Sequence, residues 1–541
     1  MRLPRAPWLA LVVVTLTLVT VGLRVRAASR PGLWADEIFS LAMATGHSLE
    51  HSAAAADTAL GDFREPSGVS SPAALRRYAE LEPHPAGAAR IVRAVLLSDT
   101  SPPLYYLLLS LWARVFGTGD AALRLFSVWW AVLAVPLLWL VGREIGGTRA
   151  AWTACALFAV APTAFYFSVE GRMYSLLWCL VLGLAWATLR LSEGIRAGTP
   201  SLWVAAGAAG LLTHYFFAFV WVAAAAWLLL TISSRLRHRA IALSALTLLL
   251  VLPWYLQVPE SLSRWRVSGD WLSGSLAWPG ALLRPVQLAG SLVAGTTVVG
   301  GWRWADRIAI GLLVVTAAWL LRQRALGRLF AGRSLLLWLW LAAACIGPLV
   351  FDILRGTTTT EIPRYVLPGL PAAILLAAVG LSLLPPALHG ASLAMLLLAW
   401  TPAIRSVVSA RVPRPRQPYR ELDAHLASWA APGDVVIVCS IPSGVVGVAR
   451  YLERDIPLFP WVVQLGTRNV PEDVERVLAG RRRVAVATIH NLGATDSLLP
   501  WLAAHATPLG RDTFPNSRAE IRYFGPPGGL DAFPLDPKRW E

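Results

Sequence analysis

Long apolar runs separated by short arginine clusters make up most of the chain as far as about residue 410. A membrane-spanning helix needs about 20 consecutive apolar residues, and arginine-rich loops tend to stay in the cytoplasm. The pattern therefore predicts about eleven spans and a cytoplasmic N-terminus. The run at 201–232 is too long for one span and is expected to form two short helices. The apolar runs lie at 7–23, 122–141, 150–167, 173–189, 201–232, 240–256, 308–321, 335–354, 366–384 and 391–408.

Two long polar segments interrupt this pattern. Residues 28–118 are expected to form the first extracytoplasmic loop, in which the short apolar stretch at 101–116 is an interfacial helix. A second loop is expected after residue 256. Beyond a proline-rich linker, alternating strand-like and helical runs predict a small extracytoplasmic α/β domain over 411–541. Its strands are expected at 434–439, 483–488 and 520–524, and its helices at 445–452, 471–478 and 495–504.

The composition also favours a membrane protein. Of the 541 residues, 56% are hydrophobic and 15% are charged, whereas soluble proteins carry about 25% charged residues. This excludes a large soluble protein and a disordered chain. The net charge of +16 is spread in short clusters rather than along one face, which argues against nucleic-acid binding. The sequence thus predicts a polytopic α-helical protein of the plasma membrane, with membrane lipid among its partners.

Four charged residues flank predicted spans on the expected outer side. Asp36 and Glu37 follow the first span. They are either solvated loop acids or a helix N-cap, or else carboxylates at the membrane surface that take a proton from an acceptor hydroxyl. Glu170 and Arg172 open a later span, where they either pair with each other or face the same cavity as Asp36. If 101–116 lies at the interface, Asp36 and Glu170 share one side of the membrane.

Two further pairs of residues lie at span ends. His214 and Tyr215 occupy the expected turn within the long run, where a lone histidine is more often a structural hydrogen-bonding group than a catalyst. Arg364 and Tyr365 open another span on the outer side. Arg364 either extends its charge to the interface or holds a phosphate at the bilayer surface through a bidentate contact.

Five sequence fragments at these span ends resemble a known family. In chain order they are Trp34-Ala35-Asp36-Glu37, Asp99-Thr100-Ser101-Pro102-Pro103-Leu104-Tyr105-Tyr106, Tyr166-Phe167-Ser168-Val169-Glu170-Gly171-Arg172-Met173-Tyr174, Thr213-His214-Tyr215-Phe216 and Arg364-Tyr365-Val366-Leu367-Pro368-Gly369-Leu370-Pro371. With them, residues 1–410 resemble the GT-C integral-membrane glycosyltransferases. They are similar to bacterial members of the dolichyl-phosphate-mannose protein mannosyltransferase family and to the lipid A aminoarabinose transferases.

The resemblance implies inverting transfer of a sugar from a polyprenyl-phosphate-linked donor, outside the cytoplasmic membrane. The acceptor is a protein, a lipid or a glycan, and the sugar is a hexose or a pentose. The family's first-loop aspartate, matched by Asp36, is taken as the catalytic base, and Glu170 lines the same site. Glu170 and the adjacent Glu37 are further catalytic candidates. The substrate-binding candidates are Asp99, Tyr105, Arg172, Tyr174, His214, Tyr215, Arg364 and Tyr365.

One position departs from the family pattern. Relatives commonly have a histidine before the two prolines, where this chain has Ser101. Binding of a divalent metal therefore remains one of the alternatives, and the implied chemistry requires no other cofactor.

Two other function classes compete with a transferase. A transporter or lipid flippase predicts ionisable residues near the bilayer midplane and repeated halves. Here the acids gather at span ends and the halves are dissimilar, which favours the transferase. A membrane scaffold that displays the C-terminal domain predicts that Asp36 can be replaced without consequence.

Overall fold

A computed structural model describes residues 7–98, 101–194, 196–267, 269, 271–295, 303–410, 417–462, 464, 468–491, 493, 495–515 and 517–535. The chain folds as two compact units, each built from segments that are far apart in the sequence. Unit 1 contains Met1–Arg30, Arg124–Leu256 and Leu272–Pro413, and unit 2 contains Pro31–Leu123, Gln257–Trp271 and Arg414–Glu541.

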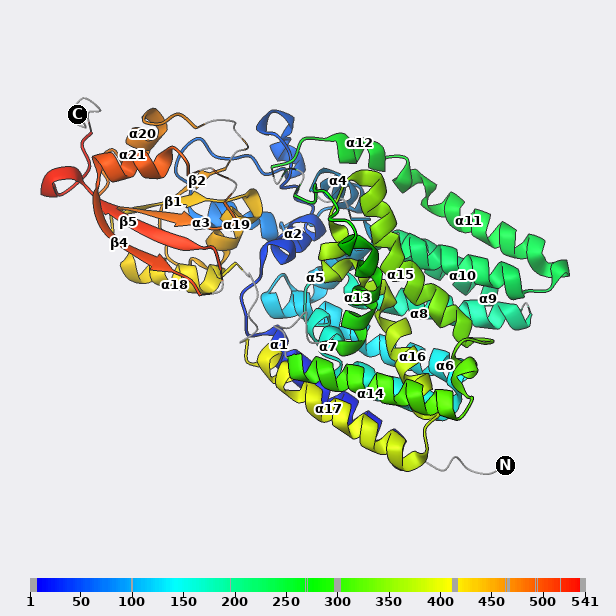
Figure 1. The fold of residues 1–541 in the computed structure, drawn as a ribbon. Helices are drawn as coiled ribbons and strands as arrows, with labels where there is room; N and C mark the ends of the chain where they lie inside the picture. Colours follow the sequence, from blue (N-terminus) through cyan, green and yellow to red (C-terminus); the bar gives the residue numbers. More distant parts are fainter. Residues whose placement is uncertain are drawn as a thin grey trace. The chain divides into compact units, whose positions relative to one another are not determined.

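Unit 1 is a bundle of apolar helices (Figure 1). The helices are α1 (Pro7–Ala28), α6 (Asp120–Val160), α7 (Pro162–Phe167), α8 (Tyr174–Glu193), α9 (Thr199–Leu211), α10 (Phe217–Thr231), α11 (Arg237–Tyr255), α13 (Gly280–Ala294), α14 (Arg303–Arg322), α15 (Ser334–Arg355), α16 (Leu370–Ser382) and α17 (Pro386–Val408). α6 is interrupted at Gly147, whose φ of 79° is the left-handed conformation that glycine tolerates. Its two halves correspond to two predicted spans.

Eight helices in the described part of the chain are long and apolar enough to cross a membrane. They cover Leu9–Ala28, Asp120–Val160, Tyr174–Glu193, Ser234–Ser263, Trp304–Arg322, Ser334–Arg355, Pro363–Ser382 and Pro386–Val408. Leu104–Phe116 and Phe217–Thr231 are shorter apolar helices. A polytopic membrane protein is therefore confirmed, while the count of eleven spans stays a prediction.

Two regions of the bundle can be compared directly with the elements predicted from the sequence. The run at 201–232 does form two short helices, with the turn at residues 212–216 between α9 and α10. The loop predicted after residue 256 is wrong in part, because it contains α13. Arg284 and Pro285 interrupt the apolar pattern of that helix, and it is shorter than a membrane span.

Close helix packing in unit 1 depends on small residues. A Cβ atom built on Gly347 in α15 would lie 2.3 Å from the ring of Phe219 in α10. Since real atoms do not approach so closely, the glycine permits the contact between these two helices.

Unit 2 combines short helices with a five-stranded sheet (Figure 1). Its elements are α2 (Ala35–Ala44), α3 (Pro72–Arg76), α4 (Ala88–Ser98), α5 (Leu104–Phe116), α12 (Val258–Ser263), α18 (Tyr419–Trp429), β1 (Val435–Cys439), α19 (Pro442–Tyr451), β2 (Leu458–Trp461), α20 (Glu472–Leu478), β3 (Val484–Thr488), α21 (Leu498–His505), β4 (Thr507–Thr513) and β5 (Glu520–Gly525). The three predicted strands and three predicted C-terminal helices are present, and β2, β4 and α18 were not predicted.

The sheet has the strand order β2-β1-β3-β5-β4. β1 is parallel to both neighbours, with Val436 opposite Leu458 in β2 and Val435 opposite Val484 in β3. β5 is antiparallel to β3 and β4. Apolar side chains from α20 and α21 form a core against one face, and α18 lies on the other face in Figure 1.

Candidate active site

The two adjacent acids of the first loop have different surroundings. Asp36 and Glu37 both lie in the first turn of α2. Glu37 is fully buried, and its carboxylate accepts the backbone N–H of Trp34 at 3.2 Å. This is the reciprocal half of a capping box, which stabilises the start of the helix. Asp36 is only half-buried. Glu37 is thus not the N-cap itself but caps the helix from its third position, and Asp36 remains the candidate base.

The segment that leads into α2 is held by residues near the C-terminus. The backbone N–H of Leu33 donates to the Tyr451 hydroxyl at 2.7 Å, and that of Ala35 donates to Gln417 Oε1 at 3.2 Å. Tyr451 in turn donates its hydroxyl to Asp120 Oδ2 at 2.6 Å. The position of Asp36 is therefore fixed through contacts that no local sequence pattern indicates.

Asp120 is the centre of this network. Besides Tyr451, it accepts Arg420 Nη2 at 2.7 Å and Arg450 Nε at 3.0 Å. The carboxylate is almost buried, so these charged partners compensate for its desolvation. Arg450 also donates to the backbone oxygen of Thr118 at 2.6 Å. Asp120 could not be singled out from the sequence, because its partners lie far along the chain in α18 and α19.

Two further polar residues share the surroundings of Asp36. Burial raises the pKa of the Tyr419 hydroxyl, and the Asp36 carboxylate raises it further. Burial lowers the pKa of the His490 imidazole, and the same carboxylate opposes that shift. His490 follows β3 with a φ of 51°. The charge of Asp36 therefore affects two polar groups of the C-terminal part of unit 2, Tyr419 in α18 and His490 after β3, that could not be singled out from the sequence.

Two residues of the second fragment were also candidates. Tyr105 is fully buried in α5, with its ring edge-on to Tyr106 at 5.4 Å between centroids. α5 packs against α2, the helix that carries Asp36. Asp99 lies outside the described residues.

In unit 1, the third fragment forms a compact turn between α7 and α8. Glu170 and Arg172 are both buried, and the N–H of Arg172 donates to the backbone oxygen of Glu170 at 2.8 Å. Ser127 donates to the Arg172 carbonyl at 3.2 Å. The ring of Tyr174 lies edge-on to Phe167 at 5.0 Å. The turn therefore holds one acid, one guanidinium and two aromatic rings within a few residues of one another.

A buried arginine of α1 supports this turn. Arg24 donates to Ser168 Oγ at 2.7 Å and to the Ala159 carbonyl at 3.1 Å, and its guanidinium lies 4.6 Å from the centre of the Phe165 ring. The sequence pattern gives no sign of this function, because arginines commonly flank membrane spans.

The structure brings the fourth and fifth fragments together. The rings of His214 and Tyr365 lie 6.4 Å apart, and Phe216 contacts Tyr365 at 5.2 Å. His214 Nδ1 accepts the N–H of Phe216 at 3.2 Å, as a structural histidine would. Arg364 lies over the Tyr365 ring at 5.6 Å.

Tyr215 points to a different neighbour. Its hydroxyl accepts the indole N–H of Trp254 at 3.2 Å, and its ring lies edge-on to Tyr255 at 5.8 Å. Both partners belong to α11. Tyr215 therefore fixes the α9–α10 turn against α11, whereas its neighbour His214 contacts the fifth fragment.

The segment that carries Arg364 is a 3-10 helix, η8 (Pro363–Gly369). Trp178 donates to the Leu367 carbonyl at 3.1 Å, and Trp340 donates to the Pro368 carbonyl at 2.7 Å. Pro371 has no N–H to offer the Leu367 oxygen four residues earlier. The Leu367 carbonyl accepts the N–H of Leu370 instead, and the buried Trp178 indole supplies a second donor that fixes η8.

A threonine-rich loop precedes η8 and converges on one carboxylate. Asp352, buried near the end of α15, accepts bonds from the hydroxyl of Thr357 at 2.6 Å and from both the N–H and the hydroxyl of Thr359 and Thr360 at 2.6–2.9 Å. These five donors offset the desolvation of the carboxylate. The loop is thereby fixed next to the segment that carries Arg364.

Two observations concern other ligands. Within the described ranges, no three His, Cys, Asp or Glu side chains form a group that would hold a metal ion.

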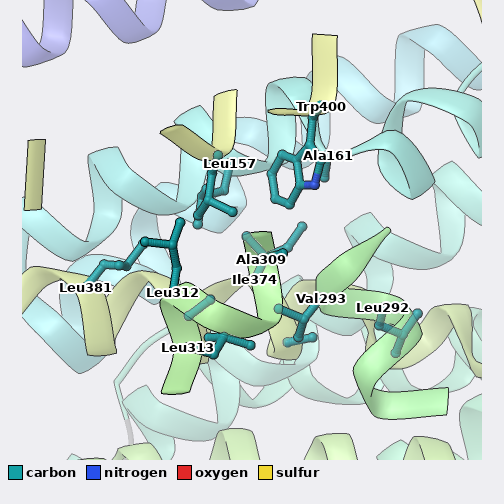
Figure 2. A pocket seen from close by; sticks show the side chains of 13 residues that line it. Leu157, Ala161, Leu292, Val293, Ala309, Leu312, Leu313, Ile374, Leu381 and Trp400 are labelled. Atoms are coloured by element: carbon teal, nitrogen blue, oxygen red, sulfur yellow. The ribbon is translucent and has the colours of Figure 1, made fainter. Parts of the chain in front are cut away.

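An apolar cavity of about 20 Å³ lies among α6, α13, α14, α16 and α17, with Trp400 on its wall (Figure 2). That volume is about the space of one water molecule.

The fold defines a polytopic membrane protein whose candidate residues lie at helix ends. A family model for dolichyl-phosphate-mannose-protein mannosyltransferases matches residues 100–256. The structure is similar to ArnT from Cupriavidus metallidurans in the apo state and bound to undecaprenyl phosphate, with 14% identity and a TM-score of 0.57 in both cases. The matches cover 95% and 96% of this chain, respectively, and 98% of the ArnT chain.

No curated protein matches the sequence. At 14% identity the likeness to ArnT shows the fold alone. The family match over residues 100–256 agrees with the resemblance indicated by the sequence fragments, the predicted fold is confirmed as ArnT-like, and the chain is a membrane protein.

Proposed function

We propose that this protein is a glycosyltransferase that uses a polyprenyl-phosphate-linked sugar at the extracytoplasmic side of the membrane. The observation that carries the proposal is the fold, which matches over nearly the whole chain an ArnT structure bound to undecaprenyl phosphate. The family match over residues 100–256 supports the same class of reaction.

The proposed step needs one base and one cation. Asp36 takes the proton from the acceptor hydroxyl, whose oxygen attacks the anomeric carbon of the sugar. The bond from that carbon to the phosphate oxygen breaks, and polyprenyl phosphate leaves with inversion at the anomeric carbon. Arg364 or Arg172 compensates the charge of the leaving phosphate. Glu37 is an unsuitable base because its carboxylate caps α2.

Substrate binding is proposed for the rest of the candidate set. Glu170 and Tyr174 lie on the compact turn with Arg172, and His214 lies with Tyr365 next to Arg364. The acceptor is a protein, lipid or glycan hydroxyl. We further propose a cytoplasmic N-terminus, because the arginine clusters at 235–239 and 322–333 then lie inside.

The experiment is a donor panel. Purified full-length protein in detergent is incubated with polyprenyl-phosphate hexoses and pentoses in the presence of protein, lipid and glycan acceptors. Release of polyprenyl phosphate together with a glycosylated acceptor is expected for one donor, and Asp36→Asn should abolish it. A flippase instead moves a lipid-linked sugar across vesicles without cleaving it. Lipid movement without cleavage, unaffected by Asp36→Asn, contradicts the proposal.

A further inference from the structure

Unit 2 contains a large open cavity that the proposed reaction does not use. Its volume is about 580 Å³, and its walls come from residues 58–78. Small-molecule sites typically have volumes of about 300–1,000 Å³. None of the lining residues belongs to the candidate active site.

The charge of this cavity is positive. Arg64 and Arg77 line it, and both side chains are exposed. Glu65 is the one acid in the lining, all of which the structure describes. Its buried carboxylate accepts Arg468 Nε at 3.0 Å and the N–H of Val462 at 2.9 Å. Glu65 is therefore already neutralised by an arginine outside the cavity, and the two lining guanidinium groups dominate the cavity charge.

The wall that carries Glu65 is fixed by the C-terminal part of unit 2. Ser70 pairs with Leu458 of β2 through two backbone hydrogen bonds, at 2.7 and 2.9 Å. Arg468 donates to the Pro66 carbonyl at 3.0 Å, and Arg476 donates to the Ser67 carbonyl at 3.3 Å. A wall held at three points loses little freedom when a ligand binds, which favours affinity.

Another part of the cavity wall orients one of the arginines. Arg77 donates to the Tyr78 hydroxyl at 3.1 Å, and its guanidinium lies 4.9 Å from the centre of the Tyr78 ring. The Tyr78 ring is buried edge-on against Phe63 at 5.1 Å. This contact uses one of the five N–H groups of a guanidinium. A planar fork placed in this way is suited to a carboxylate or a phosphate.

We propose that this cavity binds a hydroxylated anion, namely a sugar that bears a phosphate or a carboxylate group. Arg64 and Arg77 bind the anionic group. The hydroxyl groups of Thr58, Ser67 and Ser70, which also line the cavity, bind the sugar hydroxyls. The proposal does not depend on the glycosyl-transfer reaction.

The test measures binding to purified full-length protein in detergent by titration calorimetry. The probes are glucose 6-phosphate, glucuronate, inorganic phosphate and neutral glucose. One of the two charged sugars should bind more tightly than glucose and more tightly than phosphate alone. Arg64→Gln and Arg77→Gln should each weaken that binding roughly tenfold, the worth of one charge-assisted hydrogen bond.

Matched controls separate this site from simple charge attraction and from the active site. Arg518→Gln removes an exposed arginine of unit 2 outside the cavity and should leave the affinity unchanged. Asp36→Asn should bind the charged sugar normally, so failure of the transfer reaction does not affect the result. The proposal is wrong if neither charged sugar binds at concentrations up to about 10 mM, or if the double variant binds as tightly as the unmodified protein. It is also wrong if phosphate alone binds as tightly as the charged sugar.

Discussion

The Tyr451 hydroxyl connects Asp120 to the backbone of Leu33, donating to the first at 2.6 Å and accepting from the second at 2.7 Å. Leu33 and Tyr451 are 418 residues apart in the sequence. Because Asp36 follows closely after Leu33 at the start of α2, the C-terminal part of unit 2 positions the candidate base. The C-terminal part of unit 2 has no catalytic motif of its own, but through the Tyr451 hydroxyl it affects the proposed proton transfer.

Tyr451→Phe tests this relationship. The substitution keeps the ring but leaves the Leu33 N–H without its acceptor, and it should destabilise the protein by about 1–3 kcal/mol. Turnover should fall while donor affinity is retained, because the base is displaced and the donor contacts are not. Unfolding and single-turnover kinetics measure the two effects.

A second tyrosine provides the control for that experiment. Tyr523 donates to Asp512 at 2.7 Å within the sheet, and neither residue contributes to the network around Leu33. Tyr523→Phe should therefore leave turnover unchanged. Equal turnover in the two variants would show that Tyr451 does not position Asp36.

Asp36→Asn should lower turnover by roughly 10²–10⁴-fold, the usual contribution of a positioned base. The shape of the side chain is retained, so folding and donor binding should change little. Glu37→Gln is the matched variant, since its amide oxygen still accepts the Trp34 N–H and preserves the cap. If Asp36→Asn retains near-full transfer while Glu37→Gln or Glu170→Gln is inactive, the base is misassigned.

Arg364→Leu should weaken binding of the lipid donor more than it slows the chemical step. Loss of a charge-assisted contact costs about 1.5–3 kcal/mol, which is tenfold or more in affinity. Arg364→Lys should restore part of the loss, because a lysine keeps the charge without the planar fork. Binding of a polyprenyl phosphate to purified protein measures the effect.

The control for Arg364 lies in the same unit. Arg284 pairs with Glu361 at 3.5 Å, and both side chains are largely exposed. Such a pair contributes little free energy, so Arg284→Leu should leave donor affinity unchanged. If both variants bind the donor equally well, Arg364 only anchors its segment.

The sequence predicted those elements whose pattern is local. The turn within 201–232 follows from the length of one apolar run, and β1 and β3 are continuous apolar strands. β2 contains Pro460, and β4 is an exposed edge strand with Pro508 and Gly510. Neither shows the alternation that identifies a strand. Tertiary pairing, rather than propensity, makes them part of the sheet.

The candidate residues follow the same division. Asp36, Glu170 and Arg364 could be singled out because each lies at a predicted span end. Asp120 and Asp352 could not, because their partners are recognisable only once the chain has folded. The threonine run at 357–360 is visible in the sequence, but nothing in it indicates that three of these residues converge on one carboxylate.

Asp423 in α18 should make stability depend on pH. It is almost fully buried, and burial raises the pKa of its carboxyl group well above the usual value. The folded protein then keeps a proton that the unfolded chain releases above about pH 4. The unfolding free energy should therefore fall as the pH rises from about 4 through the folded-state pKa. Asp423→Asn removes this loss and should be more stable than the unmodified protein at pH 8.

Asp434 serves as the control, because its replacement by asparagine should lower the stability at pH 8 rather than raise it. It is equally buried, but it accepts Arg483 Nη2 at 2.6 Å and the N–H of Ala431 at 2.8 Å. Asp434→Asn removes the charge of a buried carboxylate that pairs with the half-buried Arg483 and should destabilise the protein at pH 8. Thermal unfolding of the full chain in detergent between pH 4 and pH 8 compares the two variants. If Asp423→Asn shows no gain at pH 8, burial does not raise the pKa of the Asp423 carboxyl group in the folded protein, because the expected gain comes from that raised pKa alone.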